Sequence, residues 1–301
     1  MSILCRSAVA GLLGAVSFVP ASALALDNDP ALRGFALCDG DGICRGRQDL
    51  FRAYAKEMGM AMAPKLLAPA ETLGLNGFSL AIGQYSVTNI HEDEEHWRRG
   101  TEQTLAETIA HEQASDTYGE AAPPGVLHTV DFRVRKGLPY SFEIGTSLTY
   151  LVDSEFFAFG GELKWALNEA VDAFPIDVAV QTGVNRCFGS TELDLTTVGL
   201  NVILSRGFGA GGVANIAPYM AYNPVFVFAR SGVLDATPGI DEAVDARDAG
   251  SAFVLGKEDA TLHRAVFGAR FVASVLSITP EVALALGEGL QNYNIQLGLD
   301  F

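Results

Sequence analysis

The sequence predicts an all-β fold, an antiparallel transmembrane β-barrel of about ten strands, with counts from eight to twelve left open, behind a short helical segment. Two bulk properties and one pattern lead to this prediction. The chain is acidic, with a formal net charge of −16, and yet its mean hydropathy is +0.22. No apolar run after residue 25 approaches the roughly 20 residues that a membrane helix needs. The apolar residues alternate with polar ones instead, as they do in strands that turn one face to lipid.

The first 25 residues are typical of a cleavable secretory signal. Arg6 is the only charged residue, Ala8 to Val19 are apolar or small, and residues 23–25 read Ala-Leu-Ala, as at a cleavage site. The apolar core is short for a helix that spans a bilayer. We therefore expect export and a mature chain that begins near Leu26.

One disulfide is expected in the exported chain. Cys38 and Cys44 are six residues apart in CDGDGIC, and exported proteins meet an oxidising environment. Cys187 is then left without a predicted partner. Asp39 and Asp41 in the same loop are too few for the six to eight oxygen ligands of Ca²⁺, and no other Cys or His stands at zinc-ligand spacing. We expect neither a metal nor a cofactor.

Residues 26–74 are predicted to form an N-terminal segment ahead of the barrel. Within it, residues 48–62 have the period of an amphipathic helix, with Leu50, Tyr54 and Met58 on one face. We expect this segment on the periplasmic side, where the helix either plugs the barrel or lies beneath it.

Residues 75–301 are predicted to form the barrel, because their apolar and polar residues alternate with a period of two. In YSFEIGTSLTYLV at 140–152, every second residue from the first Phe onward is apolar or Thr. Tight turns are predicted at KGLP, residues 136–139, and at SITP, residues 277–280. Ten such strands can be counted along this region.

Two long connections, 90–125 and 229–262, test the strand count independently. With ten strands and both termini in the periplasm, both connections fall on the side opposite the tight turns, as expected of external loops. They are also acidic: of 36 Asp and Glu in the chain, nine lie within 91–124 and seven within 230–261. We therefore expect both connections outside the cell.

The last strand resembles a known signal. YNIQLGLDF, the last nine residues, resembles the terminal strand of Gram-negative outer-membrane β-barrel proteins, in which alternate apolar residues lead to a final aromatic. The resemblance implies a location in the cell outer membrane, contact with outer-membrane lipid and lipopolysaccharide, and assembly by the barrel-assembly machinery. The face that this machinery would recognise consists of Tyr293, Ile295, Leu297, Leu299 and Phe301.

The N-terminal segment carries a second resemblance, to the fatty-acid transporter barrels, in which an N-terminal hatch plugs the pore. This chain departs from that family because it is much shorter, has fewer predicted strands and carries no hatch motif.

Charged and polar residues of both signs are predicted to line the lumen. By alternation they are Arg133, Arg135, Glu143, Glu162, Lys164, Asp177, Gln181, Arg264 and Arg270. The interior of a barrel of about ten strands is only somewhat wider than side chains can fill. Two interpretations are open: a network of ion pairs that locks the wall, since unpaired charges there would be costly, or a narrow polar pathway past the charges.

No catalytic set is predicted, and we expect no enzyme. HEDEEH at 91–96 spaces its histidines by five, whereas the zinc-protease helix needs a spacing of four, so a solvated acidic loop is the better interpretation. The acidity of the chain argues against nucleic acid as a partner. We expect a passive channel or transporter for small solutes or hydrophobic molecules. The alternatives are a closed structural or surface-interaction barrel whose loops carry the function and, less favoured, an outer-membrane enzyme.

Overall fold

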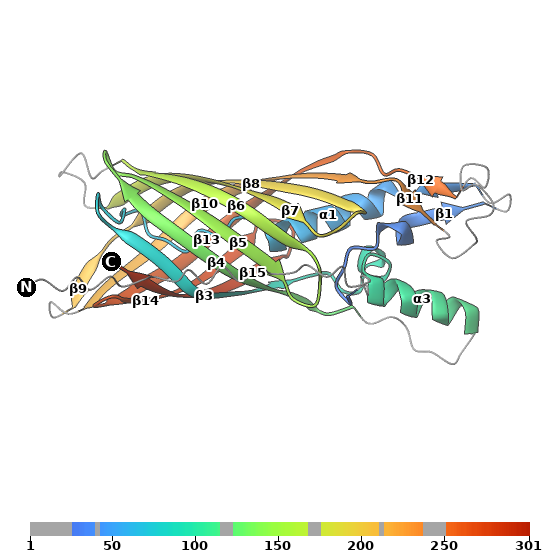
Figure 1. Ribbon diagram of the computed structural model, residues 1–301, viewed down its shortest axis with the longest axis horizontal. Helices are drawn as coiled ribbons and strands as arrows, with labels where there is room; N and C mark the ends of the chain where they lie inside the picture. Colours follow the sequence, from blue (N-terminus) through green and yellow to red (C-terminus); the bar gives the residue numbers. More distant parts are fainter. Residues whose placement is uncertain (1–25, 40–42, 115–122, 168–175, 211–213, 237–250) are drawn as a thin grey trace, which may run out of the picture.

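The alternating part of the sequence folds into long antiparallel strands that close into a barrel (Figure 1). The computed structural model describes residues 26–39, 43–114, 123–167, 176–210, 214–236 and 251–301. Each barrel strand pairs with the next, and β15 pairs with β3 to close the wall. This confirms the prediction of ten strands for the described chain. The strands are β3 (Phe78–Asn89), β4 (Val126–Leu138), β5 (Phe142–Leu151), β6 (Phe157–Ala166), β7 (Asp177–Phe188), β8 (Leu193–Ser205), β10 (Ala214–Ser231), β13 (Glu258–Ala273), β14 (Leu276–Ala285) and β15 (Gln291–Asp300).

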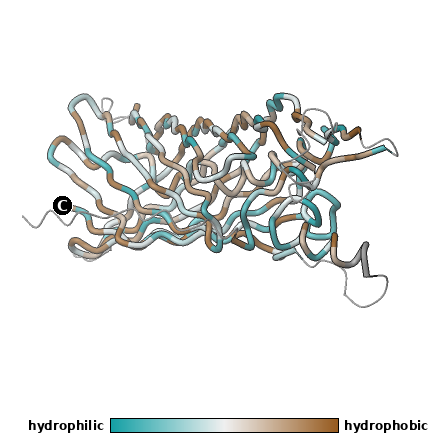
Figure 2. The backbone as a smooth tube through the Cα atoms, turned by 45° about the vertical axis from the view of Figure 1, so that its right-hand side comes forward, coloured by the Kyte–Doolittle hydropathy of each residue, from teal (hydrophilic) through white to brown (hydrophobic). Residues whose placement is uncertain are grey.

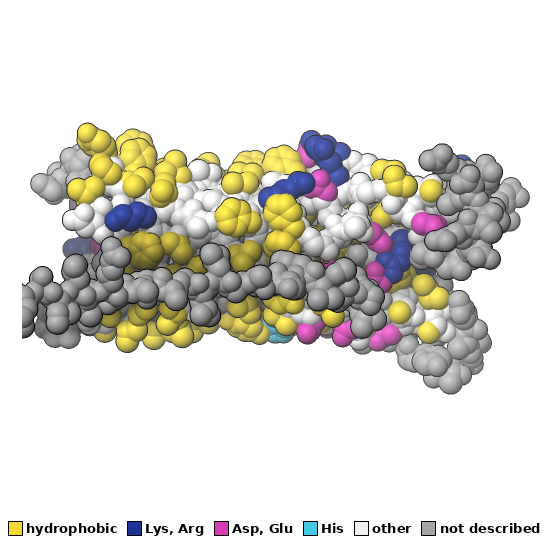
Figure 3. Space-filling model, viewed as in Figure 1, with side chains coloured by type: hydrophobic (Ala, Val, Ile, Leu, Met, Phe, Trp, Pro, Cys, Tyr) yellow, Lys and Arg dark blue, Asp and Glu magenta, His cyan; other side chains and the backbone are white. Residues whose placement is uncertain are grey.

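The wall has an apolar outer face and a polar inner face. Phe132, Phe159 and Met220 are 51%, 57% and 51% exposed, whereas Arg133, next to Phe132 in the chain, is 2% exposed. Hydropathy alternates along the strands in Figure 2, and apolar side chains gather on the barrel wall in Figure 3. A closed barrel satisfies its backbone hydrogen bonds internally, so an apolar outer face of this kind suits lipid as its surroundings.

The two ends of the barrel differ in the length of their connections. At the turn end, β4 joins β5 through residues 139–141 and β13 joins β14 through residues 274–275. The prediction of a turn at SITP is wrong, because these residues belong to β14, with Pro280 opposite Ile295. Proline favours turns, but its fixed φ also fits an extended strand.

At the other end, the loop end, lie the long connections 90–125 and 232–257 and the shorter ones 152–156, 189–192 and 286–290. The long connections contain regular elements of their own. They are α2 (Glu95–Arg98), α3 (Glu102–Ala114), β11 (Leu234–Asp235) and β12 (Ala252–Phe253); the short strand β9 (Phe208–Ala210) pairs with β10 at the turn end.

Residues 26–47 pack on the loop end. They form η1 (Leu32–Phe35), β1 (Ala36–Cys38) and β2 (Cys44–Gly46), and the predicted disulfide between Cys38 and Cys44 is confirmed. The Asn28 N–H donates to the Asp153 carbonyl at 2.9 Å, in the β5–β6 connection. We call residues 26–47, α2, α3 and the β11–β12 hairpin together the cap.

The described chain therefore begins at the loop end, but it finishes at the turn end. There the backbones of Phe301 and Phe78 exchange two hydrogen bonds of 2.8 and 2.9 Å. The prediction that both chain ends lie on one side is wrong for the described residues. The physical reason is that the chain between the cap and β3 crosses the lumen.

This crossing segment, residues 48–71, is called the plug. Its first part is α1 (Gln48–Met62), which enters the barrel from the loop end and contacts β3, β4, β8, β10 and β13. Residues 63–71 continue toward the turn end, and most of them are buried. Of the two positions left open for the helix, the structure shows the one inside the barrel. None of the described helices is long and apolar enough to cross a membrane.

Candidate functional site

The lumen is the candidate functional site, because wall side chains hold the backbone of the plug there. An extended chain cannot satisfy its own carbonyl groups, and buried carbonyls need partners. Arg133 donates to two plug carbonyls, at 2.7 and 3.1 Å. Arg264 and Asn185 each donate to one more, at 3.0 and 2.9 Å. The N–H of Ala70 donates to the Ser205 hydroxyl at 2.9 Å.

Buried ion pairs reinforce this contact toward the turn end. The Glu143 carboxylate lies 3.4 Å from the Arg135 guanidinium and 3.3 Å from the Lys164 ammonium. It also accepts a hydrogen bond from the Leu73 N–H at 3.1 Å, while Lys164 donates to the Glu71 carbonyl at 2.9 Å. Charges that are paired and hydrogen-bonded in this way tolerate burial, so the three side chains tie the end of the plug to β4, β5 and β6.

The other residues expected in the lumen also lie on the inner face. Glu162 accepts a hydrogen bond from Gln181 at 2.9 Å. Arg270 pairs with Asp300 at 2.6 Å near the turn end, and Asp177 lies opposite Ser205 at the start of β7. The ion-pair network, the first of the two interpretations, is thus present on the side of β4 to β7.

The adjoining part of the lumen wall carries polar side chains that form no hydrogen bond with the plug. Adjacent register positions on β14, β15, β3 and β4 place amide, hydroxyl and carboxylate groups side by side, and each has at least one buried polar atom with no partner among the described residues. We call this set the polar stripe: Thr279, Gln296, Gln84 and Asp131 in one row, and Asn294, Ser86 and Thr129 in the next. Buried polar atoms without a partner are costly, and ordered water commonly satisfies them.

At the loop end a buried carboxylate joins the plug to the first long connection. Glu57 of α1 accepts hydrogen bonds from the His91 N–H at 3.0 Å, the His91 ring at 2.7 Å, the His96 ring at 3.1 Å and the Trp97 indole at 2.7 Å. We call these four residues the latch. Burial alone raises the pKa of Glu57, but the hydrogen bonds from His96, His91 and Trp97 outweigh burial and lower the pKa to about 2.

The interpretation of HEDEEH as a solvated loop is wrong for His96, whereas residues 91–95 are exposed. His96 is buried, and the rings of His91 and His96 both contact Glu57. The two histidines do not share a helix, because α2 begins at Glu95. Sequence reasoning missed Glu57. A signal for it exists: Glu57 stands three residues after Tyr54 and therefore on the apolar face of the helix, where a carboxylate needs a buried partner.

No metal or nucleophile site emerges from the described residues. Among them, no three His, Cys, Asp or Glu side chains are grouped as metal ligands. Cys187 is a free thiol, buried on the inner face of β7. His128 and His263 lie on the outer wall, where their rings stack on Tyr85 and Tyr222.

No family model and no curated protein matches the chain. Among solved structures, the N-terminal β-barrel domain of OprF from Pseudomonas aeruginosa is 15% identical with a TM-score of 0.29, over 54% of this chain and 98% of that one. Ail, the attachment invasion locus protein of Yersinia pestis, in complex with the heparin analogue sucrose octasulfate, is 10% identical with a TM-score of 0.28, over 75% and 100%. Outer membrane protein Omp33 of Acinetobacter baumannii is 7% identical with a TM-score of 0.27, over 75% and 98%.

These likenesses are too distant to carry an argument, and the geometry of the chain itself defines its class. Its ten described strands close without an edge, its outer face is apolar, and its inner face is polar. The two long connections lie at the same end, opposite the short turns. The chain is therefore a β-barrel of the outer-membrane class, filled by its own N-terminal segment.

Proposed function

We propose that this protein is an outer-membrane barrel that is closed at rest and holds a structured cap on the cell surface. One observation carries the proposal: the chain from Gln48 to Glu71 runs through the lumen and is hydrogen-bonded to the wall along its course. A lumen filled in this way favours the closed surface-interaction barrel over the open passive channel. The loop end faces outward in this proposal, because external loops are the longer ones in such barrels.

The cap is built to present a defined surface. Arg33 in η1 donates to Glu102 of α3 at 2.5 Å and to Glu192 of the β7–β8 connection at 2.7 Å. It thereby joins three separate segments. Beyond this clamp, Leu37 and Ile43 beside the disulfide are 64% and 49% exposed. Exposed apolar side chains of this kind are suited to contact with a partner outside the cell.

Planar-bilayer recording of the refolded full chain tests whether the barrel is closed. We expect no steady conductance steps from the wild type at neutral pH, because the plug fills the lumen. If every barrel that inserts into the bilayer showed a stable conductance large enough for the passage of small solutes, this would contradict the proposal.

Cysteine labelling on intact cells tests the orientation. Val233→Cys lies at the loop end, where Val233 is 79% exposed, and Tyr140→Cys at the turn end, where Tyr140 is 89% exposed. A membrane-impermeant maleimide should label Val233→Cys and spare Tyr140→Cys until the cells are opened. The opposite pattern would place the cap in the periplasm.

A second candidate function is gated passage of small neutral solutes. The polar stripe supports it, because its amide and hydroxyl groups are buried in the lumen and include atoms with no hydrogen-bond partner among the described residues. Ile90, Leu127 and Leu290 are buried at the loop end of the same wall, next to the latch. Release of the latch would displace these three apolar side chains and open a path from the polar stripe to the solvent at the loop end. Conductance that appears in Glu57→Ala but not in the wild type supports this candidate, and silence in both removes it.

A further inference from the structure

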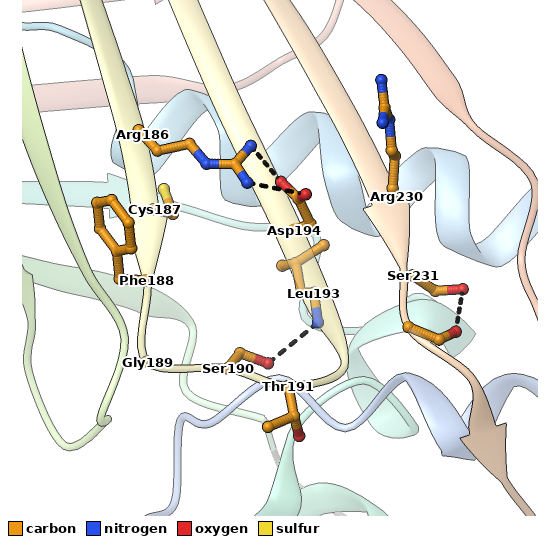
Figure 4. A pocket seen from close by; sticks show the side chains of 11 residues that line it. Arg186, Cys187, Phe188, Gly189, Ser190, Thr191, Leu193, Asp194, Arg230 and Ser231 are labelled. Carbon is orange, nitrogen blue, oxygen red and sulfur yellow. Dashed lines mark hydrogen bonds and ion pairs between the residues drawn. The ribbon is translucent and has the colours of Figure 1, made fainter.

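Among the pockets on the described outer wall, one is lined by arginine side chains at the loop end, and the closed-barrel function does not use it. It has a volume of about 410 Å³ and opens over the loop-end tips of β7, β8 and β10. Figure 4 shows Arg186, Asp194 and Arg230 side by side on these three strands. Register confirms the order, because Arg186 pairs with Thr196 on β8 and Asp194 pairs with Arg230 on β10.

The two arginines differ in how they are held. Arg186 donates to Asp194 at 2.9 Å and to the Thr196 hydroxyl at 2.8 Å, which fixes its guanidinium in place. Arg230 is exposed and has no hydrogen bond or ion pair with any described residue. None of the described residues occupies its five N–H groups, which are the donors that an anion needs.

Three of the described acids near the pocket are engaged by other cations. Asp194 is paired with Arg186, Glu192 with Arg33 and Asp259 with Lys257. Arg230 is thus a pocket-lining cation that none of these three acids neutralises. An isolated guanidinium on a lipid-facing surface is favourable only where phosphate or water can reach it.

Aromatic rings place the pocket at the membrane interface. Phe188, which lines the pocket, stacks on Phe157 with ring centroids 5.6 Å apart. Phe228, two residues before Arg230, lies under the Lys257 ammonium at 5.9 Å. In outer-membrane-type barrels, girdles of aromatic residues flank the apolar band at both interfaces.

We propose that this pocket binds the phosphate group of an amphiphile in the leaflet that meets the loop end. Arg230 is the principal ligand, and Arg186 borders the site as a second, prepositioned cation. A planar guanidinium can hold two phosphate oxygens at once. The pocket has room for a phosphate and part of the headgroup that carries it. The proposal does not depend on whether the lumen is open or closed.

The test uses the full chain in nanodiscs of zwitterionic lipid, with bound lipid counted by native mass spectrometry. The probes are diphosphoryl lipid A, the same lipid without its phosphates, and inorganic phosphate. We expect the wild type to retain the diphosphoryl lipid, and Arg230→Gln to bind it about tenfold more weakly, as the loss of a charged hydrogen bond predicts. Competition by millimolar inorganic phosphate would support a phosphate site that free anions also reach.

The matched control is Arg206→Gln. Arg206 is also exposed on the outer wall and lies over an aromatic ring, that of Phe208, but at the turn end. An equal loss of binding in Arg206→Gln would show general attraction between charges and overturn the proposal. Equal retention of the dephosphorylated lipid would overturn it as well, because the acyl chains would then account for binding. Heat-dependent gel mobility verifies that each variant is folded.

Discussion

Glu57 is the residue on which the closure of the loop end depends. Its ordinary pKa is 4.5, and the latch lowers the pKa to about 2. This shift means that ionisation of Glu57 stabilises the folded state relative to the unfolded state by about 3 kcal/mol. This free energy is fully present above pH 4.5 and is lost as the pH falls toward 2.

We accordingly expect acid to loosen the latch. His91 and His96 face Glu57 from the first long connection. Protonation of Glu57 is expected to break the pairing, because a neutral carboxyl group is a weaker acceptor than a carboxylate. Trp97 donates to Glu57 and reports the change. In a Trp165→Phe background, Trp97 fluorescence should shift to the red between about pH 4 and pH 2; an unchanged spectrum down to pH 2 would argue against the latch.

Glu57→Gln tests the same residue at neutral pH. The substitution keeps the shape of the side chain but removes the charged acceptor, and hydrogen bonds to charged groups contribute about 1.5–3 kcal/mol. We expect the Trp97 transition to move to lower urea concentration by a corresponding amount. Glu288→Gln is the control, because its partner Lys56 is the neighbour of Glu57 and the pair is partly exposed; such pairs contribute about 1 kcal/mol or less. Equal shifts in both variants would assign no special role to Glu57.

At the scale of elements, α1 is held by shape as well as by charge. A Cβ atom added at Gly59 would lie 2.6 and 2.7 Å from the two methyl groups of Val227 on β10. The helix therefore approaches the wall closely only because residue 59 has no side chain.

Gly59→Ala should displace the plug from β10. Overpacking of this kind costs about 1–3 kcal/mol, which we expect as a lower urea midpoint and as conductance bursts in planar bilayers. Gly83→Ala on β3 is the control, because a Cβ added there meets nothing within 4 Å. If Gly59→Ala matches Gly83→Ala in both measurements, the close contact does not hold the plug.

The cap depends in turn on Arg33. Arg33→Ala removes the side chain that joins η1, α3 and the β7–β8 connection. We expect limited proteolysis on intact cells to cut the cap at least several-fold faster, while the barrel stays protected. Arg45→Ala removes an exposed arginine from β2 and should leave the rate unchanged. Identical rates in the two variants would show that the cap is held by other contacts.

At the scale of the whole molecule, the hydrogen bonds between β15 and β3 that close the barrel continue to Phe301. Phe301 exchanges two backbone hydrogen bonds with Phe78 and is 65% exposed, like the outward face of β15 formed by Tyr293, Ile295 and Leu297. This geometry is consistent with the proposal that the assembly machinery recognises that face.

Deletion of Phe301 separates recognition from stability. We expect far less folded protein in the outer membrane of cells, and nearly unchanged refolding of the purified chain in detergent, because only two hydrogen bonds are lost. Phe208→Ala is the control, since Phe208 is an exposed aromatic at the same end of the barrel. A matching loss of refolding in detergent would assign the defect to stability instead.

The sequence by itself determined the two faces of the wall and the bounds of the helix, and it predicted about ten strands while eight to twelve were left open. Residues 48–62 were predicted to be helical, and α1 spans Gln48–Met62. These features follow from local rules. In a strand between lipid and lumen, apolar and polar side chains must alternate from one residue to the next. In an amphipathic helix, apolar side chains must recur about once per turn.

Only the tertiary structure decided where the helix lies, which residues meet there and at which end the described chain begins. Glu57 and His91 are 34 residues apart, and Arg33 and Glu192 are 159 apart. No period in the sequence encodes such contacts, because they depend on the direction in which the N-terminal segment passes through the closed wall. The alternation in the sequence fits a polar lumen filled by side chains alone equally well. In the structure the lumen also holds the plug, because Arg133, Arg264 and Asn185 donate hydrogen bonds to its backbone carbonyl groups.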